Sequence, residues 1–372
     1  MPKIVISGYF GFNNAGDEAI LSSTVQTLRG LAEGLEITVL SQDPPATRAQ
    51  HGVRAVHRLA FPLALAGCDL LLFGGGGLLQ DVSSQRSLVY YLSIIGLAQT
   101  LGKKTMIYAN SFGPIIRPSS AWMAARVLNR VDLITLRDAL SLEELRRINV
   151  VRPAVEITAD PALALERVDT RRGARILAEA GVDPEKAPVA AISVRPWKEN
   201  RHIPVVARAA DHLIEKYGAQ VVLFSIQPSQ DHPILKQVAR LMKRPVRILA
   251  GDYGVPDLMS VLGNARLAVA MRLHALIFSV TQGTPALGLI YDPKIEGFLE
   301  AVGLPSGGRA EELSAERVLG EIDRLWSESA SIRSRLEDAR PRLRERARAN
   351  AELALGLLGG AARGARRGRD RR

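Results

Sequence analysis

The residues best suited to chemistry in this sequence follow short apolar runs that are typical of buried strands. Arg137 follows one such run, Arg272 and His274 follow a second, and Lys294 comes just after a third. Ligands of open α/β sheets bind beyond the carboxyl ends of the strands, where these side chains are expected. Because like charges repel, cations gathered around one imidazole are better explained by a multiply charged anion than by packing. The pattern predicts an anion site with His274 as its proton-transfer group.

A simpler interpretation stays open for each of these residues. A guanidinium just past a strand is often a rim residue paired with a nearby acid, and a histidine at a helix start is often a structural hydrogen bonder. Arg195, which follows the run AAISV, is a weaker candidate for the same site. No His, Asp or Glu cluster has metal-ligand spacing and no GxSxG motif occurs. We therefore expect neither a metal nor a covalent enzyme intermediate.

Four consecutive glycines, Gly74, Gly75, Gly76 and Gly77, follow the apolar run LLLF. They remove every Cβ from what we expect to be a strand-to-helix turn, so that backbone N–H groups can approach an anion at a helix N-terminus. Close strand–helix packing alone would need one or two of the four. The run therefore favours a substrate-binding loop.

The first loop, GYFGFNNAGDEA, is less specific. Its GxxxxG spacing is followed by Asp17 and Glu18 instead of the Lys and Ser or Thr of a nucleotide-binding P-loop, and no GxGxxG motif is present. Either it is a glycine turn with an acidic helix cap, or it lines a substrate site with the amides of Asn13 and Asn14.

Strands and helical periods alternate along the chain, which indicates parallel sheets covered by helices. We expect strands at Lys3–Ser7, Ile37–Ser41, Asp69–Phe73, Lys104–Ala109, Asp132–Leu136, Val189–Val194, Gln220–Phe224, Val246–Leu249, Leu267–Ala270 and Ala286–Ile290, with helices at Asp17–Leu31, Asp138–Ile148, Val205–Tyr217, His232–Met242 and within Glu311–Leu358. The predicted organisation is an α/β domain over 1–165, a second over 166–358 with the terminal helices, and a basic disordered tail over 359–372.

Composition narrows the class of protein. Of the 372 residues 47% are apolar, and a single cysteine excludes a disulfide framework and a cysteine-built metal site. The first residues lack the pattern of a signal peptide, and no apolar run reaches the roughly 18 residues of a membrane span. We therefore expect a cytoplasmic protein.

Much of the net charge of +11 lies near the end of the chain, because residues 341–372 hold ten arginines against three acidic residues. Such a tail is either a solvated end or a peripheral contact with the anionic inner face of the cell membrane. A nucleic-acid partner is not expected, because only 5% of residues are aromatic and no RRM, KH or helix-turn-helix pattern occurs.

Seven motifs together resemble the polysaccharide pyruvyl transferase family, most of all the bacterial cell-wall type (CsaB type) that anchors S-layer proteins. They extend from about residue 3 to about residue 305 and are GYFGFNNAGDEAIL, FGGGGLLQD, YANSFGPI, TLRD, ITADPAL, ISVRPW and AMRLHALIFSVTQGTPALGLIYDPKIEGF. Their order makes the resemblance more specific than any single glycine loop. The resemblance implies two Rossmann-like domains that face a cleft, as in GT-B glycosyltransferases, and it does not cover the tail.

The resemblance also implies a reaction. Pyruvate moves from phosphoenolpyruvate onto two hydroxyls of a cell-wall polysaccharide sugar, which gives a cyclic ketal and free phosphate, with no cofactor besides this donor substrate. The implied acceptor is a glycan, with ManNAc in an undecaprenyl-diphosphate-linked precursor as the expected sugar.

Roles follow residue by residue from the matching motifs. His274 resembles the acid/base histidine of the family, and Arg137 and Lys294 resemble its donor-binding residues. Weaker assignments rest on position alone. Arg195 and Arg272 are expected to bind the donor, and Asn13, Asn14 and Asp17 the acceptor. Asp17 or Glu18 could share the role of base.

Two other classes stay open. A GT-B glycosyltransferase that uses a nucleotide sugar would share the architecture and the cationic pocket but release a nucleoside diphosphate. A non-catalytic basic protein would bind nucleic acid or membrane with steep salt dependence and without turnover.

Overall fold

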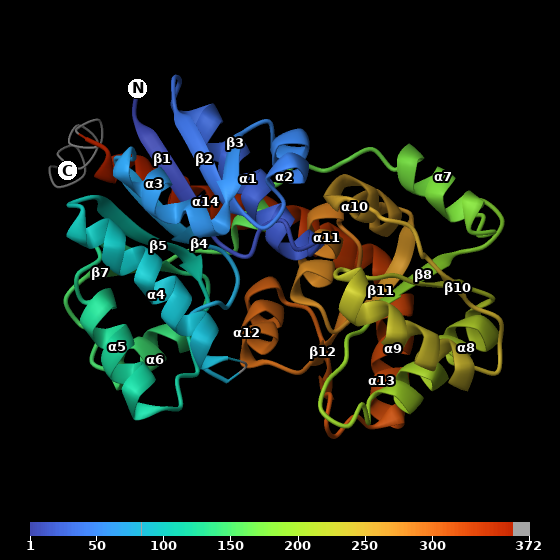
Figure 1. Cartoon of the computed structure of the whole chain (residues 1–372). Helices are drawn as coiled ribbons and strands as arrows, with labels where there is room; N and C mark the ends of the chain where they lie inside the picture. Colours follow the sequence, from blue (N-terminus) through green and yellow to red (C-terminus); the bar gives the residue numbers. More distant parts are fainter. Residues whose placement is uncertain (83, 360–372) are drawn as a thin grey trace, which may run out of the picture. The chain divides into compact units, whose positions relative to one another are not determined.

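The computed structural model describes residues 1–82 and 84–359, which form two compact units, each built on one parallel β-sheet (Figure 1). The first unit comprises residues 1–12, 17–164 and 343–359, and the second comprises residues 13–16 and 165–342. The fold class expected from the sequence, two parallel-sheet α/β domains, is confirmed.

The first sheet has seven strands in the order β3-β2-β1-β4-β5-β6-β7. The strands are β1 (Lys3–Ser7), β2 (Glu36–Ser41), β3 (Arg54–His57), β4 (Leu70–Gly74), β5 (Lys104–Asn110), β6 (Leu133–Leu136) and β7 (Ala154–Ile157). Its helices are α1 (Ala15–Leu31), α2 (Pro44–His51), α3 (Phe61–Ala66), α4 (Gln85–Thr100), α5 (Pro118–Leu128) and α6 (Leu140–Arg147). The order along the chain reverses between β1 and β4, so this is the switch point where doubly wound sheets bind ligands.

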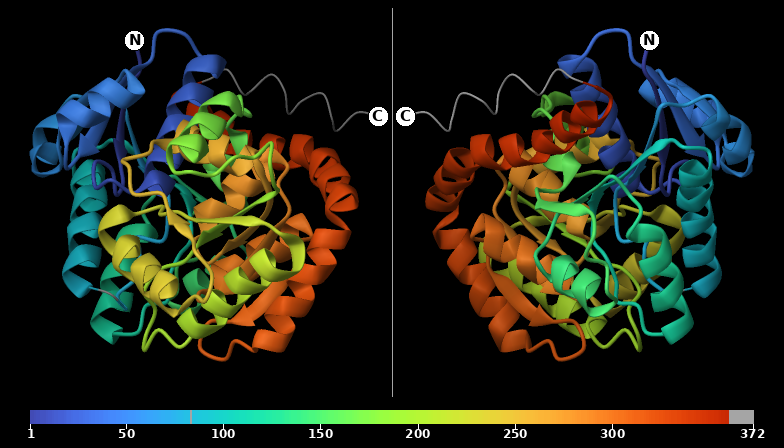
Figure 2. Two further views of the ribbon diagram at one scale, coloured as in Figure 1. Left: turned by 90° about the vertical axis from the view of Figure 1, so that its right-hand side faces the viewer. Right: turned by 90° about the vertical axis from the view of Figure 1, so that its left-hand side faces the viewer.

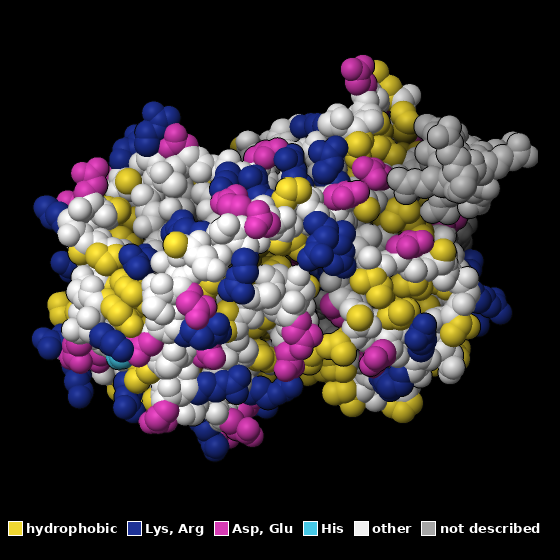
Figure 3. All heavy atoms as spheres, turned by 180° about the vertical axis from the view of Figure 1, so that it is seen from behind, with side chains coloured by type: hydrophobic (Ala, Val, Ile, Leu, Met, Phe, Trp, Pro, Cys, Tyr) yellow, Lys and Arg dark blue, Asp and Glu magenta, His cyan; other side chains and the backbone are white. Residues whose placement is uncertain are grey.

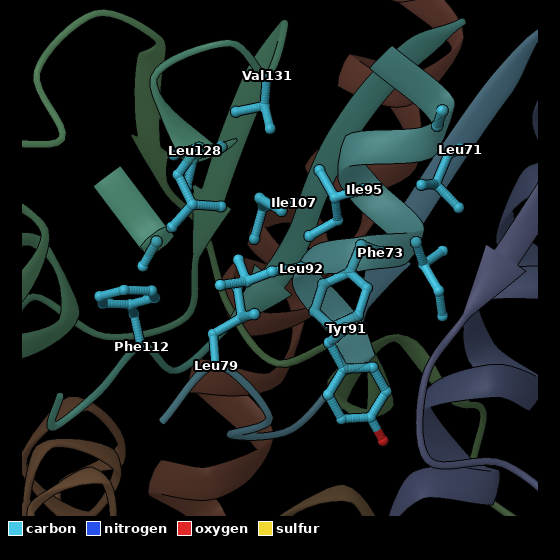
Figure 4. Packing of buried hydrophobic residues seen from close by; sticks show 14 of the residues in the cluster. Leu71, Phe73, Leu79, Tyr91, Leu92, Ile95, Ile107, Phe112, Leu128 and Val131 are labelled. Atoms are coloured by element: carbon cyan, nitrogen blue, oxygen red, sulfur yellow. The ribbon is translucent and has the colours of Figure 1, made fainter. Parts of the chain in front are cut away.

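Alternating side chains of the first sheet enter two separate cores, as the two-residue period of a strand requires. Leu71, Phe73 and Ile107 pack against Leu92 and Ile95 of α4 on one face (Figure 4). The intervening residues of the same strands pack against α1 on the other face. Each fully buried Leu, Ile or Phe side chain contributes about 1.5–3 kcal/mol, so burial on both faces holds the strand ends in fixed positions.

The second sheet has six strands in the order β10-β9-β8-β11-β12-β13. The strands are β8 (Val189–Ser193), β9 (Gln220–Leu223), β10 (Arg247–Ile248), β11 (Ala265–Ala270), β12 (Ala286–Ile290) and β13 (Ser306–Arg309). Helices cover both faces of each sheet (Figure 2), and those of this unit are α7 (Arg171–Glu179), α8 (Ile203–Tyr217), α9 (Pro228–Leu241), α10 (Val255–Gly263), α11 (Leu273–Gln282), α12 (Pro293–Val302) and α13 (Ala315–Ser327). Its switch point lies between β8 and β11.

The last helix, α14 (Ser329–Leu357), corrects the predicted domain organisation. From Leu343 onward it belongs to the first unit, whereas the sequence pattern assigned it to the second. Asn350 is fully buried there, where its Nδ2 donates to the carbonyl of Ala159 (3.0 Å) and its Oδ1 accepts from the hydroxyl of Thr158 (2.7 Å). Because these partners lie about 190 residues away along the chain, helical periodicity alone cannot assign α14 to a domain.

Three short strands, β3, β7 and β13, are absent from the sequence prediction. All three form an outer edge of a sheet. Their residues are only partly buried, so they lack the continuous apolar run that identified the central strands.

Two further expectations concern the membrane. Within the described ranges, no helix is both long and apolar enough to cross a bilayer. The basic tail predicted over 359–372 lies, apart from Gly359, outside the described residues.

Candidate active site

In the second unit, the predicted site residues lie at the carboxyl ends of neighbouring strands. Arg195 follows β8, Arg272 and His274 follow β11, and Lys294 follows β12. Since β8, β11 and β12 are adjacent in the sheet, the structure brings these residues to one sheet edge. His274 and Arg195 lie on opposite sides of the switch point.

His274 lies in the first turn of α11 and packs directly on the segment Asn13–Gly16. A Cβ added to Gly16 would lie only 2.2 Å from Nδ1 of His274, so this position admits no side chain. The amide N–H of Ala15 donates to the carbonyl of Ile226 (2.9 Å), which fixes the segment against the same sheet edge.

The two asparagines of this segment are used within the fold. Asn14 Oδ1 accepts from the amide of Gly16 (3.0 Å), and Asn13 Nδ2 donates to Asp252 (3.1 Å). Asn14 therefore acts as a cap of α1, which is the simpler of the two interpretations of the first loop. The exposed Asn13 keeps the position of a substrate contact, and that role stays a prediction.

Arg272 does not present a free charge beside His274. Its guanidinium forms a buried ion pair with Asp231 of α9, and the two side chains are 8% and 0% exposed. The second carboxylate oxygen of Asp231 accepts from the amides of Ile226 (3.1 Å) and Gln227 (3.0 Å). The pair thus joins the end of β11 to the loop after β9, and Arg272 positions the site.

Arg195, Tyr291 and Lys294 form a cationic cluster. Arg195 Nη1 donates to the Tyr291 hydroxyl (3.1 Å), and Lys294 Nζ lies 5.7 Å from the Tyr291 ring. Lys294 also pairs with Asp292 (2.7 Å), whereas no carboxylate among the described residues pairs with Arg195. Burial raises the pKa of Tyr291, but the charges of Lys294, Arg195 and Arg272 outweigh it and hold the pKa below that of an ordinary tyrosine.

These ion pairs change one argument from the sequence. Arg272 and Lys294 were treated as cations whose mutual repulsion required an external anion. The structure gives each of them a carboxylate, Asp231 and Asp292. Among the cations of this edge, Arg195 is the one that an anionic ligand meets without displacing a carboxylate.

In the first unit, Arg137 follows β6 and is buried. It forms an ion pair with Asp160, the two side chains being 5% and 3% exposed, and its Nε donates to the hydroxyl of Ser111 (2.6 Å). A guanidinium has five N–H donors, so an additional anion would meet Nη2. The role of Arg137 on the donor stays a prediction.

The glycine loop differs from its prediction. It does not open a helix, because α4 begins only at Gln85. The intervening chain instead binds the segment after β5: Asp81 accepts from the amides of Ile116 and Arg117 at 2.7 and 2.9 Å. An anion site at a helix N-terminus is therefore excluded for Gly74–Gly77.

Conformation and close packing explain at least two of these glycines. Gly75 and Gly76 have φ values of +80° and +77°, which non-glycine residues rarely adopt. A Cβ on Gly75 would lie 2.6 Å from Ile20, and one on Gly76 would lie 3.2 Å from the carboxylate of Asp17. The loop therefore places the buried Asp17 against the buried backbone of Gly76, near the first switch point.

The two acidic residues after the first loop differ in their environment. Glu18 is buried in a pair with His51 (2.8 Å) and accepts from the amide of Gly11 (2.8 Å). Its carboxylate is therefore committed to holding the loop. The role of Asp17 as a base stays a prediction.

Two acidic residues at these edges, Asp231 and Asp160, were not identified from the sequence. Their partners, Arg272 and Arg137, are distant along the chain. The side-chain amide of Asn110, at the end of β5, is buried without a hydrogen-bond partner. An unsatisfied buried amide is costly, which marks this strand end as a place where a bound group would complete the hydrogen bonding.

The fold resembles the two-domain GT-B-like architecture of several glycosyltransferases and epimerases. Similar solved structures include Anabaena HepE in complex with UDP and glucose (12% identity, TM-score 0.66, covering 96% of this chain and 99% of that one). The architecture is shared by a glycosyltransferase from Rickettsia africae, at 11% identity and a TM-score of 0.65, covering 97% of this chain and 99% of that one. It is also shared by UDP-GlcNAc 2-epimerase from Neisseria meningitidis bound to UDP-GlcNAc, at 11% identity and a TM-score of 0.62, covering 96% of this chain and 99% of that one. At these identities the likeness concerns the fold alone.

The chain belongs to the polysaccharide pyruvyl transferase family, whose model matches residues 14–293. This family consists of enzymes, and the match includes Arg137, Arg195 and His274 but begins after β1 and ends one residue before Lys294. The amylovoran biosynthesis protein AmsJ of Erwinia amylovora is 25% identical over 227 residues. That alignment covers 56% of this chain and spans about half (54%) of the length of the relative.

The Arg272–Asp231 pair yields a stability prediction. Asp231→Ala leaves a buried guanidinium without its partner and should lower the free energy of unfolding by about 3–5 kcal/mol. Asp292→Ala removes the partner of Lys294, which is partly exposed, and should cost less than about 1 kcal/mol. Urea denaturation followed by circular dichroism measures both, and equal losses would contradict the positioning role of Arg272.

Proposed function

We propose that the protein transfers pyruvate from phosphoenolpyruvate to two hydroxyls of a polysaccharide sugar as a cyclic ketal, with release of phosphate. Membership of the family supports the pyruvyl transfer. One structural observation carries the donor assignment: Arg195, Tyr291 and Lys294 gather beside His274 at a single sheet edge. This edge offers two cations for a donor with two anionic groups, together with two side chains that can move protons.

The reaction requires three proton movements. Protonation of C3 of phosphoenolpyruvate makes C2 electrophilic, and one sugar hydroxyl adds to C2 as it loses its proton. Phosphate then leaves and the second hydroxyl adds to C2 to close the ring. The two sugar hydroxyls lose two protons in total. One of them equals the proton that C3 gains, and the other leaves with phosphate.

His274 is the proposed proton-transfer group. Its first-turn position on α11 and its contact with Gly16 fix the ring in one place, as general acid–base catalysis requires. Tyr291 is a second group for this chemistry, because the surrounding cations favour loss of its proton. Asp17 of the first unit stands as a further candidate base.

Anion binding is assigned to three cations. Arg195 meets the donor without loss of an existing ion pair, and Lys294 exchanges Asp292 for a donor oxygen. Arg137 is proposed to bind a donor anion through its remaining N–H groups. Charge-assisted hydrogen bonds of this kind are stronger than neutral ones.

For the acceptor, we propose a cell-wall glycan, with ManNAc in a lipid-linked precursor as the first sugar to test, as in S-layer-anchoring enzymes. Asn13 is the exposed amide available for it. The basic tail would hold the enzyme at the anionic inner face of the membrane where such precursors lie. A panel of soluble and undecaprenyl-diphosphate-linked acceptors, with product mass as the readout, tests this assignment; release of a nucleoside diphosphate from a nucleotide sugar would instead favour a glycosyltransferase.

His274→Gln should lower kcat roughly 100-fold or more, because a general acid–base group is lost, while phosphoenolpyruvate affinity changes little. Lys294→Met should instead weaken donor binding roughly tenfold or more, because a charge-assisted contact is lost. Phosphate release measures turnover, and calorimetry measures donor binding. His57→Gln, at an exposed histidine, is the matched control. A folded His274→Gln enzyme with normal acceptor-dependent phosphate release would show that this histidine is only structural.

Metal independence gives another test. Among the residues that the structure describes, no three His, Cys, Asp or Glu side chains are arranged to hold a metal ion. We expect turnover to survive extended dialysis against EDTA. Loss of activity that returns on addition of Mg²⁺ would overturn this expectation.

The tail can be tested separately. Truncation after Leu358 should weaken binding to anionic liposomes, because each basic residue near such a surface contributes about 1 kcal/mol, while turnover of a soluble acceptor stays the same. Unchanged liposome binding would mean that the tail is merely solvated.

A further inference from the structure

A groove of about 860 Å³ lies on the first unit, between α5 and the end of α6. The proposed reaction uses none of its residues. Its lining includes four arginines, Arg126, Arg130, Arg147 and Arg152, and the exposed apolar side chains of Trp122 and Val151.

The charged side chains that line this groove are all positive. None of its lining residues is Asp or Glu. Arg126, Arg130 and Arg152 are exposed and form no ion pair with any described residue, whereas Arg147 pairs with Glu144. By contrast, basic and acidic side chains are interspersed over the face in Figure 3.

Helix dipoles explain only part of this charge. α5 and α6 both end at the groove, and a helix C-terminus favours a nearby cation within its last turn. Arg126 and Arg147 lie in those last turns, but Arg130 and Arg152 lie beyond them. An anion in the groove would offset the mutual repulsion of the three guanidinium groups that form no ion pair with a described residue.

The apolar residues of the groove are unusually open to solvent. Trp122 is 65% exposed and Val151 is 72% exposed. The guanidinium of Arg126 lies 5.7 Å from the Trp122 ring, so the indole and the charge are presented together. Tryptophan beside basic residues is typical of surfaces that rest at the headgroup level of a bilayer.

The groove is preformed. Asn129, which follows α5, donates to the carbonyl of Asn149 (2.8 Å), and its Oδ1 accepts from the amides of Val151 and Arg152 (3.0 Å each). One side chain thus fixes both walls, so little conformational entropy is lost when the groove is occupied.

We propose that this groove binds the headgroups of anionic phospholipids at a bilayer surface, with Trp122 inserted at the interface. Phosphate oxygens suit the arginine forks, and the exposed indole suits the headgroup boundary. A single-stranded nucleic acid fits less well, because it needs several aromatic side chains for successive bases and the groove has one. The proposal is independent of the donor chemistry. Lipid binding can be confirmed even if the protein does not transfer pyruvate, and pyruvyl transfer can be confirmed even if the groove binds no lipid.

The test uses the full-length chain and sedimentation with vesicles of phosphatidylcholine alone or with phosphatidylglycerol. The wild-type protein should bind only the anionic vesicles. The triple variant Arg126→Glu, Arg130→Glu, Arg152→Glu should weaken that binding at least about tenfold. A matched triple, Arg54→Glu, Arg240→Glu, Arg335→Glu, changes the net charge equally at exposed arginines without ion pairs and should weaken it far less.

Trp122 provides a local readout. Its fluorescence should shift to the blue and be quenched by brominated lipid in anionic vesicles, and Trp122→Phe should abolish most of the response although Trp197 and Trp326 remain. Unchanged melting curves show that each variant is folded. Absence of wild-type binding, equal losses in both triple variants, or no loss in the groove variant would overturn the proposal. A change in oligomeric state in the groove variant alone would mean that a second copy occupies the groove.

Discussion

The buried ion pair between Arg272 and Asp231 is the interaction on which the second-unit site depends. Both side chains are nearly inaccessible to water, so each charge is stable only because the other is present. Asp231 also accepts from the amides of Ile226 and Gln227, and the carbonyl of Ile226 holds Ala15. One carboxylate therefore links the end of β11, the loop after β9 and the segment that packs on His274.

The ion pairs also distinguish the cations that hold the site together from those that a ligand can reach. Arg272 has a buried carboxylate, and exchanging it for a substrate would leave that acid unpaired. Arg137 keeps its buried carboxylate as well, so it is proposed to bind the donor only through the N–H groups that Asp160 does not occupy. Lys294 has a partly exposed partner that a donor can replace at small cost. Arg195 has none, although its backbone carbonyl accepts from the buried His202, whose pKa burial lowers. The proposed anion site is therefore centred on Arg195, Tyr291 and Lys294.

Most of what the sequence predicted correctly depends on burial. The central strands are continuous apolar runs, and the switch points follow from their order, so the edge carrying His274, Arg195 and Lys294 was predictable. The edge strands were not, because partial exposure removes their pattern. Asp231 lies 41 residues before Arg272, and nothing local indicates that they pair. The strand-to-helix turn expected at the glycine loop was wrong, because α4 starts only at Gln85, whereas substrate binding by Gly74–Gly77 stays a prediction.

The two sheets share one strand order, yet they place different chemistry at their switch points. At β1 and β4 the first unit offers glycine backbone of positive φ beside the buried Asp17, a setting that suits hydrogen bonding to hydroxyls. At β8 and β11 the second unit offers cations, a histidine and a tyrosine, a setting that suits a small polyanion. The proposed ketal-forming transfer would need both functions, since its proposed donor is anionic and its proposed acceptor is a neutral diol. One topology with different loops therefore provides two kinds of strand end without a change in the scaffold.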